Sequence, residues 1–329
     1  MKFQGVKIAG TGSYVPRKIL TNDELSQIVD TSDEWIFTRT GISERRIAAD
    51  DEFTSDLATS SAVRALKDAG MDSADVELII VATLTPDKVF PNTASLVQNK
   101  INAPKAACFS IEAGCTGFVY GLEVAAGMVA SGLYNNALVI GAEKLTSIVD
   151  WTDRTTCVLF GDGAGAVLIT ACPVEENSYL GSDLGSNGEQ HDILHIPGGG
   201  CAAPLSRKVL DEKLNTLKMN GKEVFKHAVN GMAASAQKAL EEAGLSIGDI
   251  DWVVAHQANV RIINAVGQKL NIPEEKVYIN VDKYGNTSAA SVPIAFDEMI
   301  NKGMIKRGNK ILFVAFGGGL TWGASVVKF

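Results

Sequence analysis

An internal repeat with an offset of 174 residues is the feature that most restricts how this 329-residue chain can fold. Six of ten positions are identical between residues 61–70 and residues 235–244, and both segments end in a glycine. The same offset aligns, without gaps, the apolar runs 75–82 and 138–141 with their second-half counterparts. The chain is therefore predicted to consist of two similar halves in tandem.

Each half alternates helical and strand patterns in the same order. A helix with a glycine stop precedes a β-branched apolar strand, and a further helix and apolar strand follow, which is typical of largely parallel sheets covered by helices on both faces. The halves are expected at residues 1–173 and 174–329, with the join near residues 172–187. Residues 181–204 are expected to form a long irregular loop, with one candidate strand at 193–196.

The composition predicts a globular protein and excludes several classes of partner. Hydrophobic residues make up 46% and charged residues 21%, which fits a folded domain and not a disordered chain. The net charge of −8, without a basic stripe, argues against binding of nucleic acid.

Targeting and cysteine patterns point to the cytoplasm. The N-terminus lacks the apolar core of a signal peptide, and no apolar run reaches the roughly 18 residues that span a membrane. Five cysteines without a CxxC pair suit reduced thiols better than a disulfide framework or a zinc site. We therefore expect a cytoplasmic protein that neither spans nor binds a membrane.

Cys115 stands between two glycines at the end of an apolar run, and an Ala-rich, Pro-free segment follows it. This pattern predicts that Cys115 lies where a strand gives way to a buried helix. A helix N-terminus lowers the pKa of a thiol and makes a thiolate nucleophile available. The alternative is simple packing, because free cysteine is among the most often buried residues.

The repeat suggests partners for Cys115 in the second half. His256 ends the strand whose first-half equivalent ends at Ala82, and Cys115 aligns with Ala289, three residues after Asn286. If the halves pack about a pseudo-twofold axis, Cys115, His256 and Asn286 converge on one buried place. A thiol beside an imidazole and a carboxamide is a nucleophile with groups that can activate it and hold an oxyanion. Taken singly, His256 could be a core histidine and Asn286 a turn residue.

Three other motifs contain residue types that occur at ligand-binding sites. Residues 160–166 are glycine-rich, but a strand pattern follows them, so they do not match a nucleotide-binding loop. His191 and His195 lie near Cys201 in a predicted loop, and no metal site is expected there. Trp35 and an arginine four residues later share a helix face that could hold a flat ring, although a half-buried Trp covered by an Arg stem is the alternative.

With these motifs, the sequence resembles the β-ketoacyl-acyl carrier protein synthase III family of the thiolase-like superfamily. The resemblance covers essentially the whole chain and rests on residues 114–118, 256–259, 285–291 and 316–323. It implies a five-layered αβαβα arrangement of two pseudo-twofold related α/β halves. Elongating members of the superfamily carry a second histidine where this chain has Asn286, which selects the initiating branch.

The resemblance implies a condensation in two steps that starts fatty acid synthesis. Cys115 would take the acyl group of a short acyl-CoA, and malonyl-acyl carrier protein would then lose carbon dioxide and attack that acyl group. His256 and Asn286 would donate hydrogen bonds to the enolate-like oxygen, and the backbone N–H groups of Cys115 and Gly318 would form the oxyanion hole. No cofactor is implied beyond these thioester substrates.

The resemblance also implies where coenzyme A binds. Trp35 and Arg154 are expected to stack on its adenine, with Thr31 and Arg39 lining the same site. The pantetheine tunnel is expected to be lined by Gly221, Phe225, Ala258 and Asn259.

Further residues follow from the same resemblance. Phe90 matches the residue that reaches across a homodimer interface to close the partner's acyl pocket, to which Phe316 is also assigned. Three basic residues near the tunnel mouth could dock the acidic acyl carrier protein, with ordinary solvated charges as the alternative. They are Lys226, Arg261 and Lys269.

Two rival functions are compatible with much of this pattern. A thiolase-like synthase of secondary metabolism, of the polyketide or quinolone type, would keep the Cys, His and Asn but accept another acyl donor or extender. A catalytically silent acyl-CoA or carrier-binding protein would not need them. The primer itself is open, because acetyl and short branched groups differ by methylenes worth only about 1 kcal/mol each.

Overall fold

Two mixed β-sheets frame the molecule in the computed structural model, which describes residues 3–329. The first sheet has the order β1 (Gly5–Tyr14), β7 (Asp162–Cys172), β6 (Asn136–Lys144), β4 (Leu78–Ala82) and β5 (Ala107–Ile111). The second has the order β11 (Trp252–Ala255), β12 (Lys310–Gly317), β13 (Thr321–Lys328) and β8 (Tyr179–Ser186). Two small ribbons pair β2 (Lys18–Thr21) with β3 (Glu44–Ile47) and β9 (Leu194–His195) with β10 (Lys218–Met219). The pairings β6–β4–β5 and β11–β12 are parallel, and the other main-sheet pairings are antiparallel.

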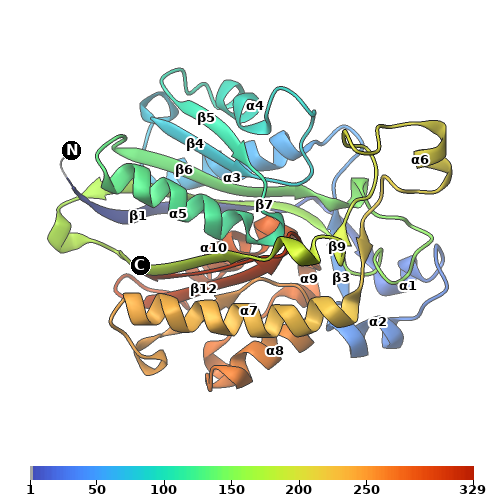
Figure 1. Cartoon of the computed structure of the whole chain (residues 1–329). Coiled ribbons are helices and arrows are strands. Elements are labelled where there is room, and N and C mark those ends of the chain that lie inside the picture. Colours follow the sequence, from blue (N-terminus) through green and yellow to red (C-terminus); the bar gives the residue numbers. More distant parts are fainter. Residues whose placement is uncertain (1–2) are drawn as a thin grey trace.

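Helices form three further layers around these sheets (Figure 1). The outer layer on the first sheet consists of α3 (Thr54–Ala69) and α4 (Thr93–Lys100). The middle layer, between the two sheets, consists of α5 (Gly117–Ala130) and α10 (Ser291–Asn301). The outer layer on the second sheet consists of α7 (Gly221–Glu242) and α8 (Val260–Lys269). The short helices are α1 (Asn22–Leu25), α2 (Asp33–Thr40), α6 (Arg207–Asp211) and α9 (Val281–Tyr284). The predicted five-layered α/β fold is therefore confirmed.

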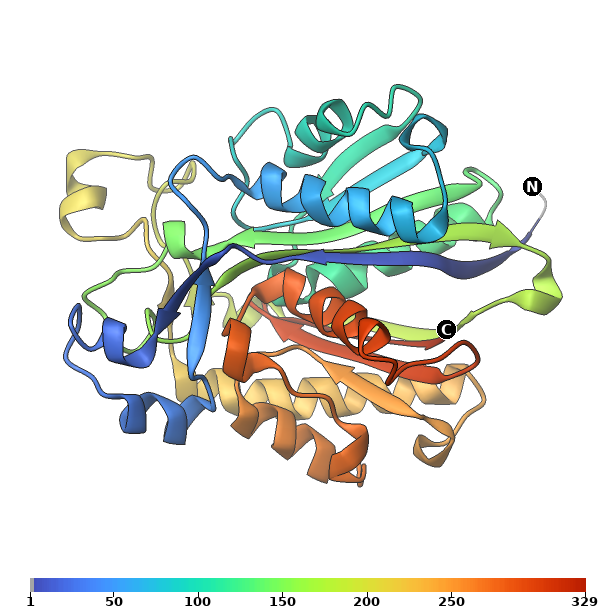
Figure 2. The same ribbon diagram turned by 180° about the vertical axis from the view of Figure 1, so that it is seen from behind.

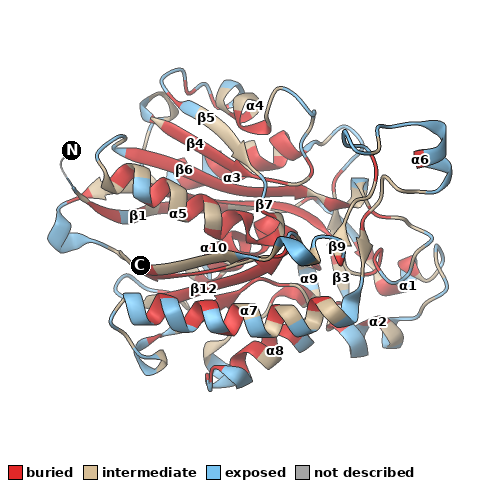
Figure 3. Ribbon diagram, viewed as in Figure 1, coloured by how far each residue is buried: buried red, intermediate tan, exposed pale blue. Residues whose placement is uncertain are grey.

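The middle-layer helices are mainly apolar, so most of α10 and the sheet-facing side of α5 are buried (Figure 3). Phe118 of α5 and Phe296 of α10 both meet Phe313 of β12 edge to face, with ring centroids 6.3 and 5.0 Å apart. These contacts join the two halves through the second sheet. Seen from behind, α3 lies across the first sheet and α10 runs beside β1 (Figure 2).

The 174-residue offset recurs in the starts of matching elements. It relates β1 to β8, β6 to β12 and α5 to α10. It also relates the single turns that precede the two middle helices, η2 (Gly114–Thr116) and η8 (Ser288–Ala290). The predicted glycine stops, Gly70 and Gly244, both adopt a left-handed φ of 65°. The domain boundary at 173/174 stays a prediction.

The predicted loop from residue 181 onward is wrong in its first part, where β8 extends to Ser186 and pairs with β13. The glycines there serve close packing and not turns. A Cβ at Gly181 would lie 2.5 Å from the backbone oxygen of Ala239 in α7, and one at Gly185 would lie 2.3 Å from Trp322 Nε1. The candidate strand at 193–196 is present as the two-residue β9.

Candidate active site

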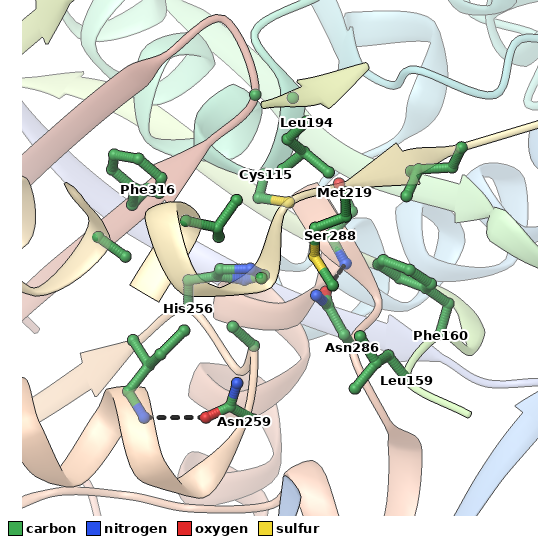
Figure 4. Close-up of a pocket in the computed structure, with 18 of the residues that line it drawn as sticks. Cys115, Leu159, Phe160, Leu194, Met219, His256, Asn259, Asn286, Ser288 and Phe316 are labelled. Carbon is green, nitrogen blue, oxygen red and sulfur yellow. Dashed lines mark hydrogen bonds between the residues drawn. The ribbon is translucent and has the colours of Figure 1, made fainter. Parts of the chain in front are cut away.

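Cys115, His256 and Asn286 line one cavity of about 760 Å³ (Figure 4). Cys115 lies in η2, between the parallel strand β5 and the buried helix α5, as the sequence pattern predicts. His256 directly follows β11, and Asn286 lies between α9 and η8. Of these three residues, Cys115 comes from the first half of the chain, and His256 and Asn286 come from the second.

Close backbone contact holds Cys115 beside the segment after β12. A Cβ at Gly317 would lie 2.5 Å from the Cys115 backbone nitrogen, and one at Gly114 would lie 3.1 Å from the Gly318 nitrogen. Gly114 also has a φ of 53°, a conformation that side chains rarely adopt. Only glycine at both positions lets the two amides meet at the cavity that Cys115 and Gly318 line.

The Cys115 thiol does not have the lowered pKa expected from its place before α5. Burial raises the pKa to about 12, and the nearby carboxylates of Glu143 and Glu112 add to this effect. Cys115 is only 8% exposed, so desolvation of a thiolate outweighs the stabilisation from the helix N-terminus. The thiol stays protonated in the free protein, and we expect it to lose its proton as the acyl donor reacts.

The Asn286 amide is held in one orientation by its own turn. Ser288 N–H donates to Asn286 Oδ1 at 2.8 Å, so the NH₂ group is left for the cavity. In this turn Ser288 adopts a left-handed φ of 49°, which is unusual for a residue with a side chain. Ser288 lines the same cavity, and its buried hydroxyl lies near the Cys115 thiol and the Glu143 carboxyl.

His256 is neutral in this setting. Burial lowers the pKa of His256 to about 3, and the residue is 3% exposed. Its Nδ1 lies 2.7 Å from the hydroxyl of Ser291, the first residue of α10. The ring is therefore fixed by one contact while it lines the cavity.

Sequence reasoning missed Glu143, a fully buried carboxyl near the end of β6. It accepts hydrogen bonds from the hydroxyls of Thr85 at 2.6 Å and Thr83 at 3.2 Å, and from the Leu84 N–H at 3.2 Å. Burial nevertheless raises the pKa of Glu143 to about 7. A lone carboxylate after the apolar run 137–142 was the available signal.

Replacing Glu143 with glutamine should make stability less dependent on pH. As pH rises, the Glu143 carboxyl loses its proton near the ordinary pKa of 4.5 in the unfolded chain, but only near pH 7 in the folded protein. Between these values the folded state binds the extra proton, so the free energy of unfolding of the wild type falls as pH rises. Between pH 5 and pH 8, we expect the free energy of unfolding of E143Q to rise relative to that of the wild type by at most about 3 kcal/mol.

Denaturant unfolding of both proteins across this pH range measures the effect. The exposed Glu175 supplies a matched control for the loss of one carboxylate, through the variant E175Q. A difference between E143Q and the wild type that stays constant with pH would contradict the raised pKa of Glu143.

The predicted adenine-stacking residues meet at the surface. The guanidinium carbons of Arg154 and Arg39 lie 5.1 and 4.6 Å from the ring centre of the half-buried Trp35. Arg154 also donates to the Asp30 backbone oxygen at 2.9 Å. The hydroxyl of Thr31 is buried and has no hydrogen-bond partner in the described chain. The Trp35 ring thus lies beside two guanidinium groups at the surface.

The remaining predicted residues divide between the cavity and the surface. The cavity wall includes Arg39, Gly221, Phe225, Ala258, Asn259, Arg261 and Phe316. Asn259 Oδ1 also accepts from Ile262 N–H at 2.9 Å and so caps α8. Phe90 is outside the cavity wall and 86% exposed. Lys226 and Lys269 are surface residues of α7 and α8, and Lys269 bonds to Asn230 Oδ1.

Residues 3–329 contain neither a metal-binding cluster nor a membrane-spanning helix. Within them, no three side chains of the metal-binding types come close enough to share an ion. No helix in that range combines the length and the apolar character that crossing a bilayer requires.

Known proteins resemble this chain over nearly its full length. Residues 109–188 match the family model of 3-oxoacyl-(acyl-carrier-protein) synthase III, and residues 240–329 match its C-terminal model. A β-ketoacyl-(acyl-carrier-protein) synthase III from Caldanaerobacter subterraneus is 54% identical over 98% of this chain and 97% of its own. The crystal structure of a 3-oxoacyl-(acyl-carrier-protein) synthase III from Aquifex aeolicus has 49% identity and a TM-score of 0.91, covering 99% of this chain and 100% of that one. The priming β-ketosynthase of the R1128 polyketide pathway has 34% identity and a TM-score of 0.92, covering 100% and 97%.

The fold and its buried Cys, His and Asn define a class, the thiolase-like condensing enzymes, which are acyltransferases. Within that class, the chain belongs to the β-ketoacyl-acyl carrier protein synthase III family.

Proposed function

We propose that this enzyme joins a short acyl-CoA primer to malonyl-acyl carrier protein, giving a 3-oxoacyl-acyl carrier protein through an acyl group on Cys115. The observation that carries the proposal is the one cavity that Cys115, His256 and Asn286 all line, where Ser288 N–H holds Asn286 Oδ1 and leaves the Asn286 NH₂ group free to donate. The reaction consumes two thioesters and needs no cofactor. It would take place in the cytoplasm and start fatty acid synthesis.

In the first step, Cys115 sulfur attacks the thioester carbonyl of the acyl-CoA. The bond to the coenzyme A sulfur breaks, and the thiol proton leaves with coenzyme A. The oxygen charge that develops would be held by the backbone N–H groups of Cys115 and Gly318. Removing one such donor typically costs on the order of 3 kcal/mol of transition-state stabilisation.

In the second step, malonyl-acyl carrier protein occupies the same cavity. Its carbon–carboxylate bond breaks, carbon dioxide leaves, and the electron pair moves toward the thioester oxygen. His256 and Asn286 would donate hydrogen bonds to that oxygen. The new carbanion attacks the acyl carbonyl, and the released Cys115 thiolate takes a proton from water. Apolar walls protect both reactive species from hydrolysis.

Coenzyme A would bind with its adenine against Trp35 and its pantetheine in the cavity. Base stacking on an aromatic ring is worth about 1–3 kcal/mol, so W35A should raise KM for acetyl-CoA by about tenfold or more and leave kcat nearly unchanged. Acetyl-pantetheine lacks the adenine and should react equally well with both proteins. Steady-state kinetics with the two donors measure the difference.

Phe37 provides a matched control for this variant. It lies on the same helix α2 and is half exposed, and its ring takes part in no cation–π contact within the described chain. F37A should therefore keep the wild-type KM for acetyl-CoA. An equal loss with acetyl-CoA and acetyl-pantetheine in W35A would contradict the stacking role.

A homodimer is proposed from the open edge of the first sheet. Strand β5 ends that sheet and has no partner on its outer side within the described chain. The adjoining loop exposes Val89 completely and Phe90 to 86%. An unpaired edge and exposed apolar side chains favour pairing with a second copy of the chain. Phe90 of one copy would then close the acyl pocket of the other copy, which that copy's own Phe316 also lines.

Carrier-protein docking is proposed for the basic residues near the cavity. Arg261 lines the cavity, and Lys226 and Lys269 lie on the neighbouring helix surfaces. On a protein with a net charge of −8, such a patch offers a specific landing place for an acidic partner.

The likeness to a priming polyketide synthase favours one second candidate, priming of a secondary pathway. Incubation with a panel of acyl-CoAs, followed by intact-mass spectrometry, identifies the primer on Cys115. Transfer from malonyl groups on carrier proteins of either pathway then separates the candidates. Absence of any acyl adduct would overturn both.

A further inference from the structure

A buried hydrogen bond joins His256 to Ser291, a residue that takes no direct part in the proposed reaction. Ser291 Oγ lies 2.7 Å from His256 Nδ1, and the backbone N–H of Gln257 donates to the same Oγ at 3.3 Å. Ser291 is only 2% exposed, so water cannot replace these contacts. The hydroxyl is therefore enclosed between one donor and one imidazole nitrogen.

Counting donors and acceptors decides which ring nitrogen carries the hydrogen. A neutral imidazole has one N–H, and burial keeps the His256 ring neutral. The Ser291 oxygen already accepts from Gln257, and its O–H has no acceptor except Nδ1 within the described chain. If Nδ1 carried the hydrogen, this O–H would be buried without a partner, which is unfavourable. The Ser291 O–H therefore donates to Nδ1, and the ring hydrogen lies on Nε2.

The internal repeat supports a functional origin of this pair. At the 174-residue offset, His256 corresponds to Ala82 and Ser291 to Gly117, the first residue of α5. Alanine and glycine have no polar side-chain atom, so the two equivalent positions in the first half cannot form such a hydrogen bond. The hydroxyl and the imidazole thus occur together in the half that supplies Asn286.

We propose that Ser291 is a positioning residue that holds His256 in the Nε2–H tautomer, so that the ring presents a hydrogen-bond donor to the cavity. This inference rests on the proposed condensation and deepens it. Nε2–H and the Asn286 NH₂ group then both donate to the enolate-like oxygen during loss of carbon dioxide. With Nδ1 occupied and Nε2 protonated, His256 does not accept the Cys115 proton, which leaves on coenzyme A.

The variant S291A removes the hydroxyl, and S291T restores it as the matched control. We expect S291A to slow carbon dioxide release from malonyl-acyl carrier protein by roughly 10- to 100-fold, as for other residues that orient a histidine. Acylation of Cys115 by acetyl-CoA should stay within about twofold, because it does not use His256. S291T should recover most of the decarboxylation.

The tautomer itself is read by ¹⁵N NMR of the histidine-labelled enzyme. The chain has four histidines, so comparison with H256A identifies the His256 signals. The wild type should show a hydrogen on Nε2, and S291A should lose or mix that state. A wild-type signal with the hydrogen on Nδ1 would overturn the proposal, whether or not S291A folds.

The kinetic outcomes separate this inference from the proposed function. Unchanged carbon dioxide release in a folded S291A would refute the role of Ser291 alone. Equal loss of acylation and decarboxylation, without recovery in S291T, would show a merely structural role and also refute it. A wild type that takes no acyl group, or releases no carbon dioxide, would refute the proposed function while the tautomer could still be read.

Discussion

Replacing Cys115 with alanine is expected to remove the acyl-enzyme and with it the condensation. The thiol is the one nucleophile at the cavity in the proposed reaction, so its loss should lower the turnover by roughly 10⁴-fold or more, as for other covalent nucleophiles. Intact-mass spectrometry after incubation with acetyl-CoA measures the adduct directly. A stable acyl group on C115A would contradict the assignment.

Cys201 makes a matched control for this experiment. It is an exposed free cysteine in the segment before α6, whereas Cys115 is buried. C201A should keep both the acyl adduct and the turnover. Because Cys115 is packed against glycine backbone, thermal unfolding of C115A should also be measured, and a folded but unacylated variant is the expected outcome.

Replacing Asn286 with alanine should separate the two half-reactions. The variant loses the NH₂ group that faces the cavity, and removal of one such donor typically costs 10²–10³-fold in rate. We expect carbon dioxide release from malonyl-acyl carrier protein to fall by about that factor, while acylation of Cys115 stays within a few-fold. H256A should behave in the same way if both residues donate to one oxygen.

Single-turnover assays of acylation and of carbon dioxide release test this separation. N286A also loses the hydrogen bond from Ser288 N–H, so its melting temperature must be compared with the wild type. The exposed Asn301 at the end of α10 serves as a control, and N301A should leave both half-reactions unchanged. Unchanged carbon dioxide release in folded N286A would contradict the proposed role.

Much of the site could be predicted because it depends on local pattern and on the repeat. The apolar run before Cys115 and the Ala-rich segment after it lead to β5, η2 and α5, as expected. His256 follows a strand as its sequence indicates, and the repeat places Asn286 near the counterpart of η2. The local pattern had already singled out Trp35, and the family resemblance added Arg154, whose guanidinium lies over the Trp35 ring.

The sequence by itself determined most of the order of elements, the two similar halves and the convergence of Cys115, His256 and Asn286 on one cavity. These follow from periodicity, glycine stops and repetition, which act over a few residues at a time. Only the tertiary structure decided the strand β8, the high pKa of Cys115 and the contact between His256 and Ser291. Each of these depends on which distant segments exclude water and supply partners. The glycines of β8 pack against α7 and Trp322. At Cys115, burial raises the thiol pKa by more than the helix N-terminus lowers it. Desolvation and hydrogen-bond pairing are properties of the packed chain, so no local pattern specifies them.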